Sequence, residues 1–362
     1  MSGLLQRLKT RIALAGPLTV ADYMGEALGN ARQGYYRDGD PLGAKGDFIT
    51  APEISQVFGE LIGAWLAERW QALGSPACAH LVELGPGRGT LLADALRATR
   101  NVAGFHAALD LHLVEINPTL KEMQRAALEA HTVQWHDGFA SVPDDAPLLL
   151  VANEFFDALP IRQLQRTAGD WRERLVALDG ERLQFVLAPG PSPLAALLDP
   201  TLAAASVGAI AELTLPGMAL AQDIAARIAR RRGAALIVDY GHAAPALGDS
   251  LQAVAGHRRA DPLADPGNAD LSAHVDFAAL ARAAAAQGAI VCGPATQGEF
   301  LRSLGIELRC RALTKSADAT TSAIVEGGVA RLIEPKQMGT LFKVLALVDE
   351  QSAAPAGFPA VA

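Results

Sequence analysis

The chain has 362 residues, enough for about two domains or for one domain with a large insertion. Its 31 Lys and Arg residues against 39 Asp and Glu residues give a net charge of −8, which argues against a nucleic-acid-binding protein held by a basic face. No stretch reaches the roughly 18 apolar residues of a membrane-spanning helix, so we expect no membrane insertion. The three cysteines lie far apart, which favours a reducing compartment over a disulfide framework.

The N-terminal region is predicted to be helical. Apolar residues at helical spacing indicate a first helix from Leu4 to Leu14, which Gly16-Pro17 ends. Its basic residues resemble those of a targeting segment, but the spacing favours a helix of the folded protein. A turn-rich stretch at 35–43 interrupts the pattern before helical spacing resumes. We therefore assign residues 1–75 to an N-terminal helical segment with a lid loop.

Short apolar runs alternate with helical patterns along the rest of the chain. The predicted strands are 80–84, 111–114, 133–135, 147–152 and 234–238. This alternation predicts an α/β fold with a doubly wound, mostly parallel sheet, whose ligand lies at the carboxyl ends of the strands.

The alternation of strands and helices is interrupted between about residues 163 and 215. Asp179-Gly180 separates two alternating runs and predicts a β-hairpin. We expect four segments after the N-terminal one: 76–162 and 216–350 as two parts of the core, 163–215 as an inserted hairpin and helical subdomain, and 351–362 as a flexible tail. Residues 242–275 read as loops on the substrate side.

A glycine-rich loop follows the first predicted strand, in Glu83-Leu84-Gly85-Pro86-Gly87-Arg88-Gly89-Thr90. Glycines allow the backbone to approach a ligand closely, and the following helix offers free N–H groups. Thr90 stands where the dinucleotide pattern G-x-G-x-x-G needs its third glycine, and the Walker lysine is absent. The loop, with Glu83, Gly85, Gly87 and Gly89, therefore favours a ligand with a small zwitterionic end over a dinucleotide.

Two acidic residues follow the next two strands. Glu115 can accept hydrogen bonds from both ribose hydroxyls of an adenosine. Asp137 can accept one from the exocyclic amine of adenine. Each alone is equally well explained as an ordinary strand-end or turn residue. Together with the glycine loop they fit S-adenosylmethionine as cofactor.

The fourth strand ends in Asn153-Glu154-Phe155-Phe156-Asp157, beside the expected position of the methyl group. Methyl transfer mainly requires proximity, orientation and exclusion of water. If the acceptor is an arginine, its high pKa calls for a carboxylate to orient and polarise the guanidinium. Asn153, Glu154 and Asp157 are therefore the candidate catalytic residues. A helix N-cap with two buried phenylalanines is the alternative.

Three further candidates lie in GDFITAPEIS, where Asp47, Thr50 and Glu53 belong to a loop that could close over the ligand or simply begin a helix. The eight histidines show no metal-ligand spacing, so we predict structural roles for them and no metal site. The G-x-S-x-G pattern of a hydrolase is absent as well.

These motifs together resemble the MidA family of S-adenosylmethionine-dependent methyltransferases, related to the mitochondrial assembly factor of respiratory complex I. The matching segments are GDFITAPEISQVFGELIG, LVELGPGRGTLL, NEFFDALPIRQ, LIVDYGH, ADLSAHVDF and MGTLFKVL. The resemblance implies a Rossmann-like class I methyltransferase core. The family's eukaryotic member symmetrically dimethylates an arginine of a complex I core subunit as a type II protein arginine methyltransferase.

The resemblance also implies roles for individual positions. It implies a cofactor loop at Gly85, Gly87 and Gly89, a ribose contact at Glu115, and active-site residues at Asn153, Glu154 and Asp157. Ser250 and Ser272 depart from the threonines expected there. We expect a bacterial cytoplasmic enzyme with a protein substrate, possible homodimerisation and no nucleic-acid partner. A small-molecule methyltransferase, a non-catalytic assembly chaperone and an NAD- or FAD-dependent oxidoreductase stay open as alternatives.

Overall fold

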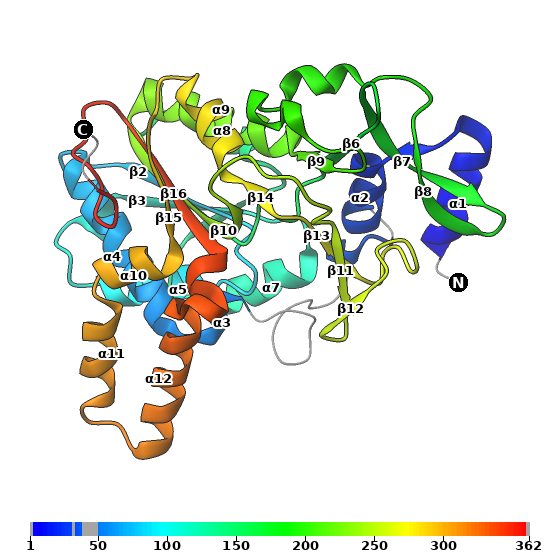
Figure 1. The fold of residues 1–362 in the computed structure, drawn as a ribbon. Helices are drawn as coiled ribbons and strands as arrows, with labels where there is room; N and C mark the ends of the chain where they lie inside the picture. The colour runs from blue at the N-terminus through cyan, green and yellow to red at the C-terminus, as the bar shows by residue number, and fades with distance from the viewer. Residues whose placement is uncertain (1–2, 31–32, 38–49, 360–362) are drawn as a thin grey trace.

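The computed structural model describes residues 3–30, 33–37 and 50–359, and an eight-stranded sheet forms its centre (Figure 1). Its strands are, in spatial order, β15 (Ile290–Thr296), β16 (Phe342–Val348), β10 (Gly233–His242), β5 (Leu148–Asn153), β2 (Ala79–Leu84), β3 (Leu109–Val114) and β4 (Val133–His136), with β14 (Val275–Asp276) beside β10. The five strands from β10 to β4 pair in parallel, whereas β16 is antiparallel to both of its neighbours. The predicted mostly parallel sheet is confirmed.

Helices cover both faces of this sheet, as the doubly wound prediction requires. The helices α4 (Gln56–Ala72) and α5 (Thr90–Thr99) share a core with Leu81 and its neighbours on one face. On the other face, α8 (Leu215–Arg231) and α9 (Phe277–Ala285) share a core with Val82. Burial on both faces explains why the strands read as continuous apolar runs.

A second, antiparallel sheet lies beside the first and carries the predicted hairpin. It consists of β1 (Leu18–Thr19), β7 (Trp171–Asp179), β6 (Arg162–Arg166) and β9 (Ile210–Leu213), with β8 (Arg182–Leu187) paired to β7. The N-terminal helices α1 (Gly3–Ala15) and α2 (Val20–Gly29) pack against it, because Leu4, Leu8 and Ile12 join the same core as Val176. The first helix is therefore part of the fold, as its spacing predicts.

The segment 242–275, expected to be loops, contains a small antiparallel sheet instead. Its strands are β12 (Arg258–Ala260), β11 (Gln252–Ala255) and β13 (Asp270–Ser272). Strands of three or four residues are too short to show an alternating pattern, which explains why the sequence reads as loop.

The described part of the C-terminal tail, up to residue 359, contacts α4 and α10 (Gln297–Ser303). Trp65 Nε1 donates to the carbonyl oxygen of Ala356 at 3.1 Å, and Arg69 Nη1 donates to that of Ala353 at 2.8 Å. Phe358 packs against Phe300 with ring centroids 5.4 Å apart. These partners are remote in sequence, so the Ala- and Pro-rich composition of the tail gives no sign of them.

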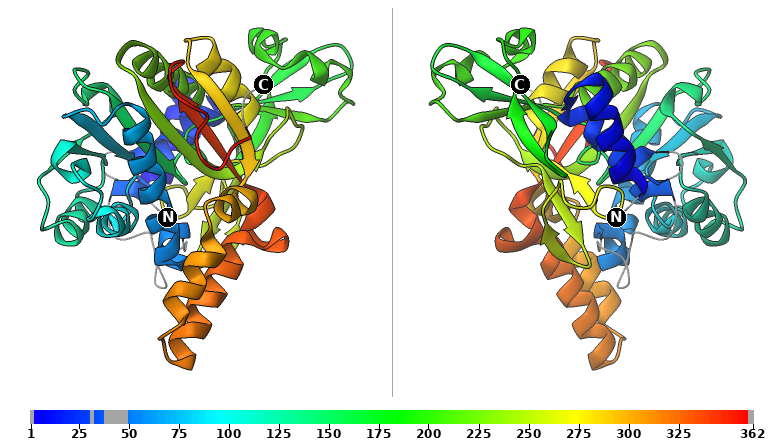
Figure 2. Two further views of the ribbon diagram at one scale, coloured as in Figure 1. Left: turned by 90° about the vertical axis from the view of Figure 1, so that its left-hand side faces the viewer. Right: turned by 90° about the vertical axis from the view of Figure 1, so that its right-hand side faces the viewer.

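The remaining helices complete the chain. They are α3 (Ala51–Ile54), α6 (Phe105–Ala108), α7 (Pro118–Ala127), α10 (Gln297–Ser303), α11 (Ile306–Thr314), α12 (Ala319–Ile333) and the short turns η1 (Tyr35–Arg37), η2 (Phe139–Ser141), η3 (Pro193–Leu197), η4 (Pro200–Ala204) and η5 (Pro335–Gly339). Figure 2 shows α11 and α12 as a hairpin that projects from the body. Within the described residues, no helix has both the length and the apolar character needed to cross a bilayer.

Helix α4 packs so closely on α5 that Gly63 has no room for a side chain. A Cβ at Gly63 would lie 2.6 Å from the Cα of Ala95. We expect Gly63→Ala to lower the free energy of unfolding by about 1–3 kcal/mol. Gly327 in α12 has open space around it, so Gly327→Ala should raise that free energy by about 0.5–1 kcal/mol. Urea unfolding of both variants tests this packing, and equal effects of the two changes would contradict it.

Candidate active site

A pocket of about 390 Å³ opens at the carboxyl ends of β2, β3, β4 and β5. Most of the residues predicted from the sequence line it. They are Thr50, Glu53, Glu83, Gly85, Gly87, Glu115, Asp137, Asn153 and Glu154. Gly89 and Asp157 are not part of its wall, and Asp47 lies outside the described residues. The wall also includes Met24 and Leu28 of α2, which nothing in the sequence assigned to the site.

The glycine-rich loop adopts a backbone that requires glycine. Gly85, Gly87 and Gly89 have φ angles of +60°, +54° and +83°, in the left-handed region that other residues rarely adopt. A Cβ at Gly85 would lie 2.8 Å from a ring carbon of Phe155. Gly89 is the N-cap of α5, so the loop leads directly into this helix, whose first residues Thr90 and Leu91 line the pocket.

Glu83, at the end of β2, supplies a buried acceptor beside this loop. Its Oε2 is buried and has no hydrogen-bond partner among the described residues. Burial raises the pKa of Glu83 to about 8. A buried polar atom without a partner is costly, so this oxygen is suited to a ligand that brings a hydrogen-bond donor.

Glu115 follows β3 and is held in one orientation. Its Oε1 accepts hydrogen bonds from the backbone N–H groups of Ile116 and Asn117, both at 2.8 Å. Gln124 Nε2 lies 3.3 Å from Oε2 and also donates to the carbonyl oxygen of Gly87 at 2.7 Å. Burial raises the pKa of Glu115, and the two backbone donors oppose that shift. Gln124 thus connects Glu115 to the glycine loop. This role could not be predicted from the sequence, where Gln124 is one polar residue of a helix.

Asp137 follows β4 at the rim of the pocket. Its Oδ1 accepts from Lys121 Nζ at 2.9 Å, and its side chain is 87% exposed. An exposed ion pair of this kind stabilises the fold little, so the Asp137 carboxylate can exchange this contact for one with a ligand at small cost.

Glu154 follows β5 and has an unusual backbone. Its φ of +52° is in the left-handed region, which costs a residue with a Cβ about 1 kcal/mol or more. Its Oε1 accepts from the backbone N–H of Ala51 at 2.8 Å and from Asn153 Nδ2 at 3.1 Å. Burial raises the pKa of Glu154 to about 7. The strained backbone and the fixed carboxylate are consistent with a functional position, as the sequence predicts for Glu154.

Asp239, in β10, holds the loop that contains Glu154. Its Oδ2 accepts from the backbone N–H groups of Phe155, Phe156 and Asp157 at 3.0–3.2 Å. Burial, followed by the charges of Asp157 and Glu154, raises the pKa of Asp239 well above its ordinary range. Asp239 directly follows the predicted strand 234–238, so its place at a strand end could have marked it as a candidate. It was not among the predicted site residues.

Asp157 faces β10 rather than the pocket. Tyr240 Oη donates to Asp157 Oδ2 at 2.5 Å. Burial raises the pKa of Asp157 to about 6, and the hydrogen bond from Tyr240 opposes that shift. Asp157 is therefore not on the pocket wall, although its charge still raises the pKa of Glu154.

The predicted lid segment is docked on the glycine-rich loop. Glu53 Oε1 accepts from Thr90 Oγ1 at 2.5 Å, and Glu53 Oε2 lies 3.4 Å from Arg88 Nη1. Ser55 caps α4 by accepting from the backbone N–H of Val57, whereas the Thr50 side chain makes no capping bond to α3. Helix α3 is thus joined to the glycine-rich loop through Glu53 and to Glu154 through Ala51.

Comparison with known proteins identifies the family. Residues 61–295 match the family described as "Putative S-adenosyl-L-methionine-dependent methyltransferase". The chain belongs to this family. It is therefore an S-adenosylmethionine-dependent methyltransferase, as the glycine loop and its acidic neighbours predict, and the oxidoreductase alternative is excluded.

The relatives span nearly the whole chain. The protein arginine methyltransferase NDUFAF7, mitochondrial, of Danio rerio is 39% identical over 96% of this chain and 87% of its own length. The human protein of the same name is 37% identical over 96% of this chain and 84% of its own length. A crystal structure from Burkholderia thailandensis bound to S-adenosyl-homocysteine has a TM-score of 0.85 at 28% identity, covering 98% of this chain and 93% of that chain.

The buried Glu83 carboxyl gives the ligand-free protein a specific pH dependence. Its pKa of about 8 exceeds the ordinary value of 4.5, so the folded state binds the proton more tightly than the unfolded chain. The resulting stabilisation is complete below pH 4.5 and is lost as the pH rises through about 8. We expect Glu83→Gln to remove this loss. Urea unfolding of both proteins at pH values below 4.5 and above 8 measures the change in stability. If the wild type and the variant show the same dependence of stability on pH, the pKa of Glu83 is not raised in the folded state.

Proposed function

We propose that this chain transfers a methyl group from S-adenosylmethionine to the guanidinium of an arginine in a protein. The observation that supports this most directly is the Glu154 carboxylate, which is fixed at the pocket by Ala51 and Asn153. A guanidinium presents planar N–H donors that match a carboxylate, so a fixed carboxylate suits an arginine acceptor. The relatives named protein arginine methyltransferases give independent support.

We propose that the pocket binds the cofactor along the strand ends. Gly85 and Gly87 would lie against its methionine end, where the unpartnered Glu83 carboxyl oxygen can meet an ammonium donor, and Gly89 would shape the turn into α5. Glu115 would accept hydrogen bonds from the ribose hydroxyls through Oε2, since its Oε1 already accepts from two backbone donors.

Asp137 would accept a hydrogen bond from the adenine amine at the rim of the pocket. When bound, S-adenosylmethionine supplies an electrophilic methyl group on its sulfonium. The residues of the chain would position the acceptor and exclude water. Proximity and orientation then lower the activation barrier of methyl transfer.

Three residues of this chain would position the acceptor, either directly or through neighbouring groups. Glu154 would orient the guanidinium and polarise it toward the nucleophilic nitrogen, and Asn153 would hold the Glu154 carboxylate in place. Asp157 would act through the loop, because it is hydrogen-bonded to Tyr240 and not on the pocket wall. The lid residues Thr50 and Glu53 would close the pocket over the cofactor.

We propose a core subunit of respiratory complex I as the protein substrate, on the strength of the family resemblance of the sequence motifs. The curated relatives are named as mitochondrial, and the similar crystal structure is of a protein from the bacterium Burkholderia thailandensis. The bacterial cytoplasmic location and the homodimer stay predictions. If the chain methylates a small molecule and no protein, the alternative of a small-molecule methyltransferase is favoured.

Glu115→Ala tests the ribose assignment. The variant leaves the ribose hydroxyls without their acceptor, so S-adenosylmethionine should bind about 1–3 kcal/mol more weakly. Titration calorimetry with S-adenosylmethionine and S-adenosylhomocysteine measures the loss. Asp137→Ala is the matched control at an exposed position and should weaken binding less. Unchanged cofactor affinity in Glu115→Ala would sink the assignment.

Glu154→Gln tests the arginine assignment. The neutral amide should leave cofactor binding intact and reduce methyl transfer by about 100-fold or more. Burial raises the pKa of Glu154 to about 7, and its carboxylate is the proposed active form, so wild-type transfer should rise with pH through about 7. Transfer of a labelled methyl group to a complex I subunit measures both effects. Glu122→Gln on the exposed side of α7 is the control, and equal rates in both variants would remove Glu154 from the reaction.

A further inference from the structure

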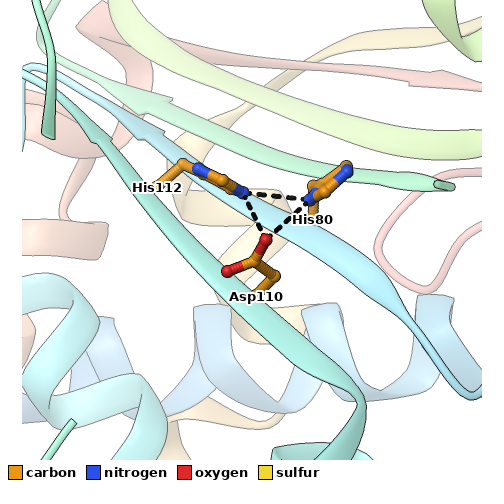
Figure 3. A group of neighbouring side chains, drawn as sticks. All are labelled: His80, Asp110 and His112. Atoms are coloured by element: carbon orange, nitrogen blue, oxygen red, sulfur yellow. Dashed lines mark hydrogen bonds and ion pairs between the residues drawn. The ribbon is translucent and has the colours of Figure 1, made fainter. Parts of the chain in front are cut away.

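Three side chains that are remote from the pocket meet on one face of the central sheet. In the β2–β3 pair, His80 is in register with Asp110, and Val82 with His112. Residues two apart on a strand point to the same face, so His80, Asp110 and His112 share it. Figure 3 shows the three side chains directed toward one point.

The three potential ligand atoms form a small triangle. His112 Nε2 lies 2.9 Å from His80 Nδ1 and 3.1 Å from Asp110 Oδ2, and His80 Nδ1 lies 3.4 Å from that oxygen. Two ligands bound at about 2.0–2.1 Å to a tetrahedral zinc ion are about 3.3 Å apart. The triangle therefore has nearly the dimensions of one face of such a coordination shell.

The other ring nitrogen of each histidine already has a partner. His80 Nε2 lies 2.7 Å from Asp145 Oδ1, and His112 Nδ1 lies 3.0 Å from His136 Nε2. Metal-binding histidines usually donate from their second nitrogen to a carboxylate or another acceptor, which fixes the ring and its tautomer. Here this outer set of contacts is in place around both rings.

The burial of the two histidines and the charge of the nearby carboxylates also favour the binding of a cation. The imidazoles of His80 and His112 are almost completely buried, so the protein holds them rigidly. The Asp110 side chain is 38% exposed, which leaves an approach from solvent and room for a water as fourth ligand. Two carboxylates, Asp110 and Asp145, contribute negative charge next to the rings.

We propose that His80, Asp110 and His112 bind a divalent transition-metal ion of the zinc type. Imidazole nitrogens and a carboxylate oxygen are the ligands that this class of ion accepts. The site lies four residues before the end of β2, about 13 Å from the glycine loop at 3.3 Å per residue. The ion's role is therefore to join β2, β3 and the loop of Asp145, not to take part in methyl transfer.

This inference departs from the prediction of no metal site. Sequence spacing did not reveal it because the ligands come from two strands, and only the sheet register brings them together. It is independent of the proposed function, since none of its residues lines the pocket.

Titration calorimetry of Zn²⁺ into the tag-free, metal-depleted full chain tests the proposal. We expect one equivalent to bind to the wild type. Asp110→Asn removes the charged ligand at a half-exposed position and should weaken binding by at least about 10-fold, and Asp145→Asn by about 10–100-fold. His257→Gln changes an exposed histidine away from the cluster and should bind Zn²⁺ like the wild type.

Two further readouts separate this site from nonspecific binding. Co²⁺ should give visible absorption bands in the wild type, intense for a tetrahedral site and weak for an octahedral one, and Asp110→Asn should lose them. Binding of S-adenosylmethionine to Asp110→Asn, unchanged from the wild type, shows that the variant is folded. If the wild type binds no Zn²⁺, or if both Asn variants bind it as tightly as the wild type does, the cluster is a hydrogen-bond network only and the proposal fails.

Discussion

The candidate active site depends on one buried carboxyl group. Asp239 accepts the backbone N–H groups of three successive residues after β5 with a single oxygen, and the backbone N–H of Tyr240 with the other. These contacts hold the turn in which Glu154 adopts a positive φ. A strained backbone persists only where its surroundings over-determine it, and here Asp239 supplies much of that constraint. The position of the Glu154 carboxylate at the pocket follows from it.

The same turn connects the two halves of the pocket. Glu154 accepts from the first residue of α3, Ala51, and Glu53 of that helix contacts Thr90 and Arg88 beside the glycine loop. Helix α3 (Ala51–Ile54) therefore joins the glycine-rich loop to the Glu154 carboxylate, which are the proposed cofactor and acceptor sides of the pocket.

Much of this site could be predicted because of a general property of parallel sheets. Their carboxyl ends meet at one edge, so the sequence alone predicts that acids after these strands, such as Glu115 and Glu154, lie at the same edge, and both line the pocket. Positions fixed by long-range contacts could not be predicted. The orientation of Asp157 depends on Tyr240, and the cluster around His112 depends on the pairing register of β2 and β3. The contacts of Ala356 and Phe358 could not be predicted either, because their partners lie far away in the sequence, in α4 and α10.

The central claim is that the acceptor atom is a guanidinium nitrogen of a protein arginine. The most direct measurement is tandem mass spectrometry of a complex I core subunit after incubation with the chain and methyl-labelled S-adenosylmethionine. The account predicts that the label is on the terminal nitrogens of one arginine and that its amount increases with time and enzyme. Label on a lysine, on a carboxyl group or only on a small molecule would contradict it.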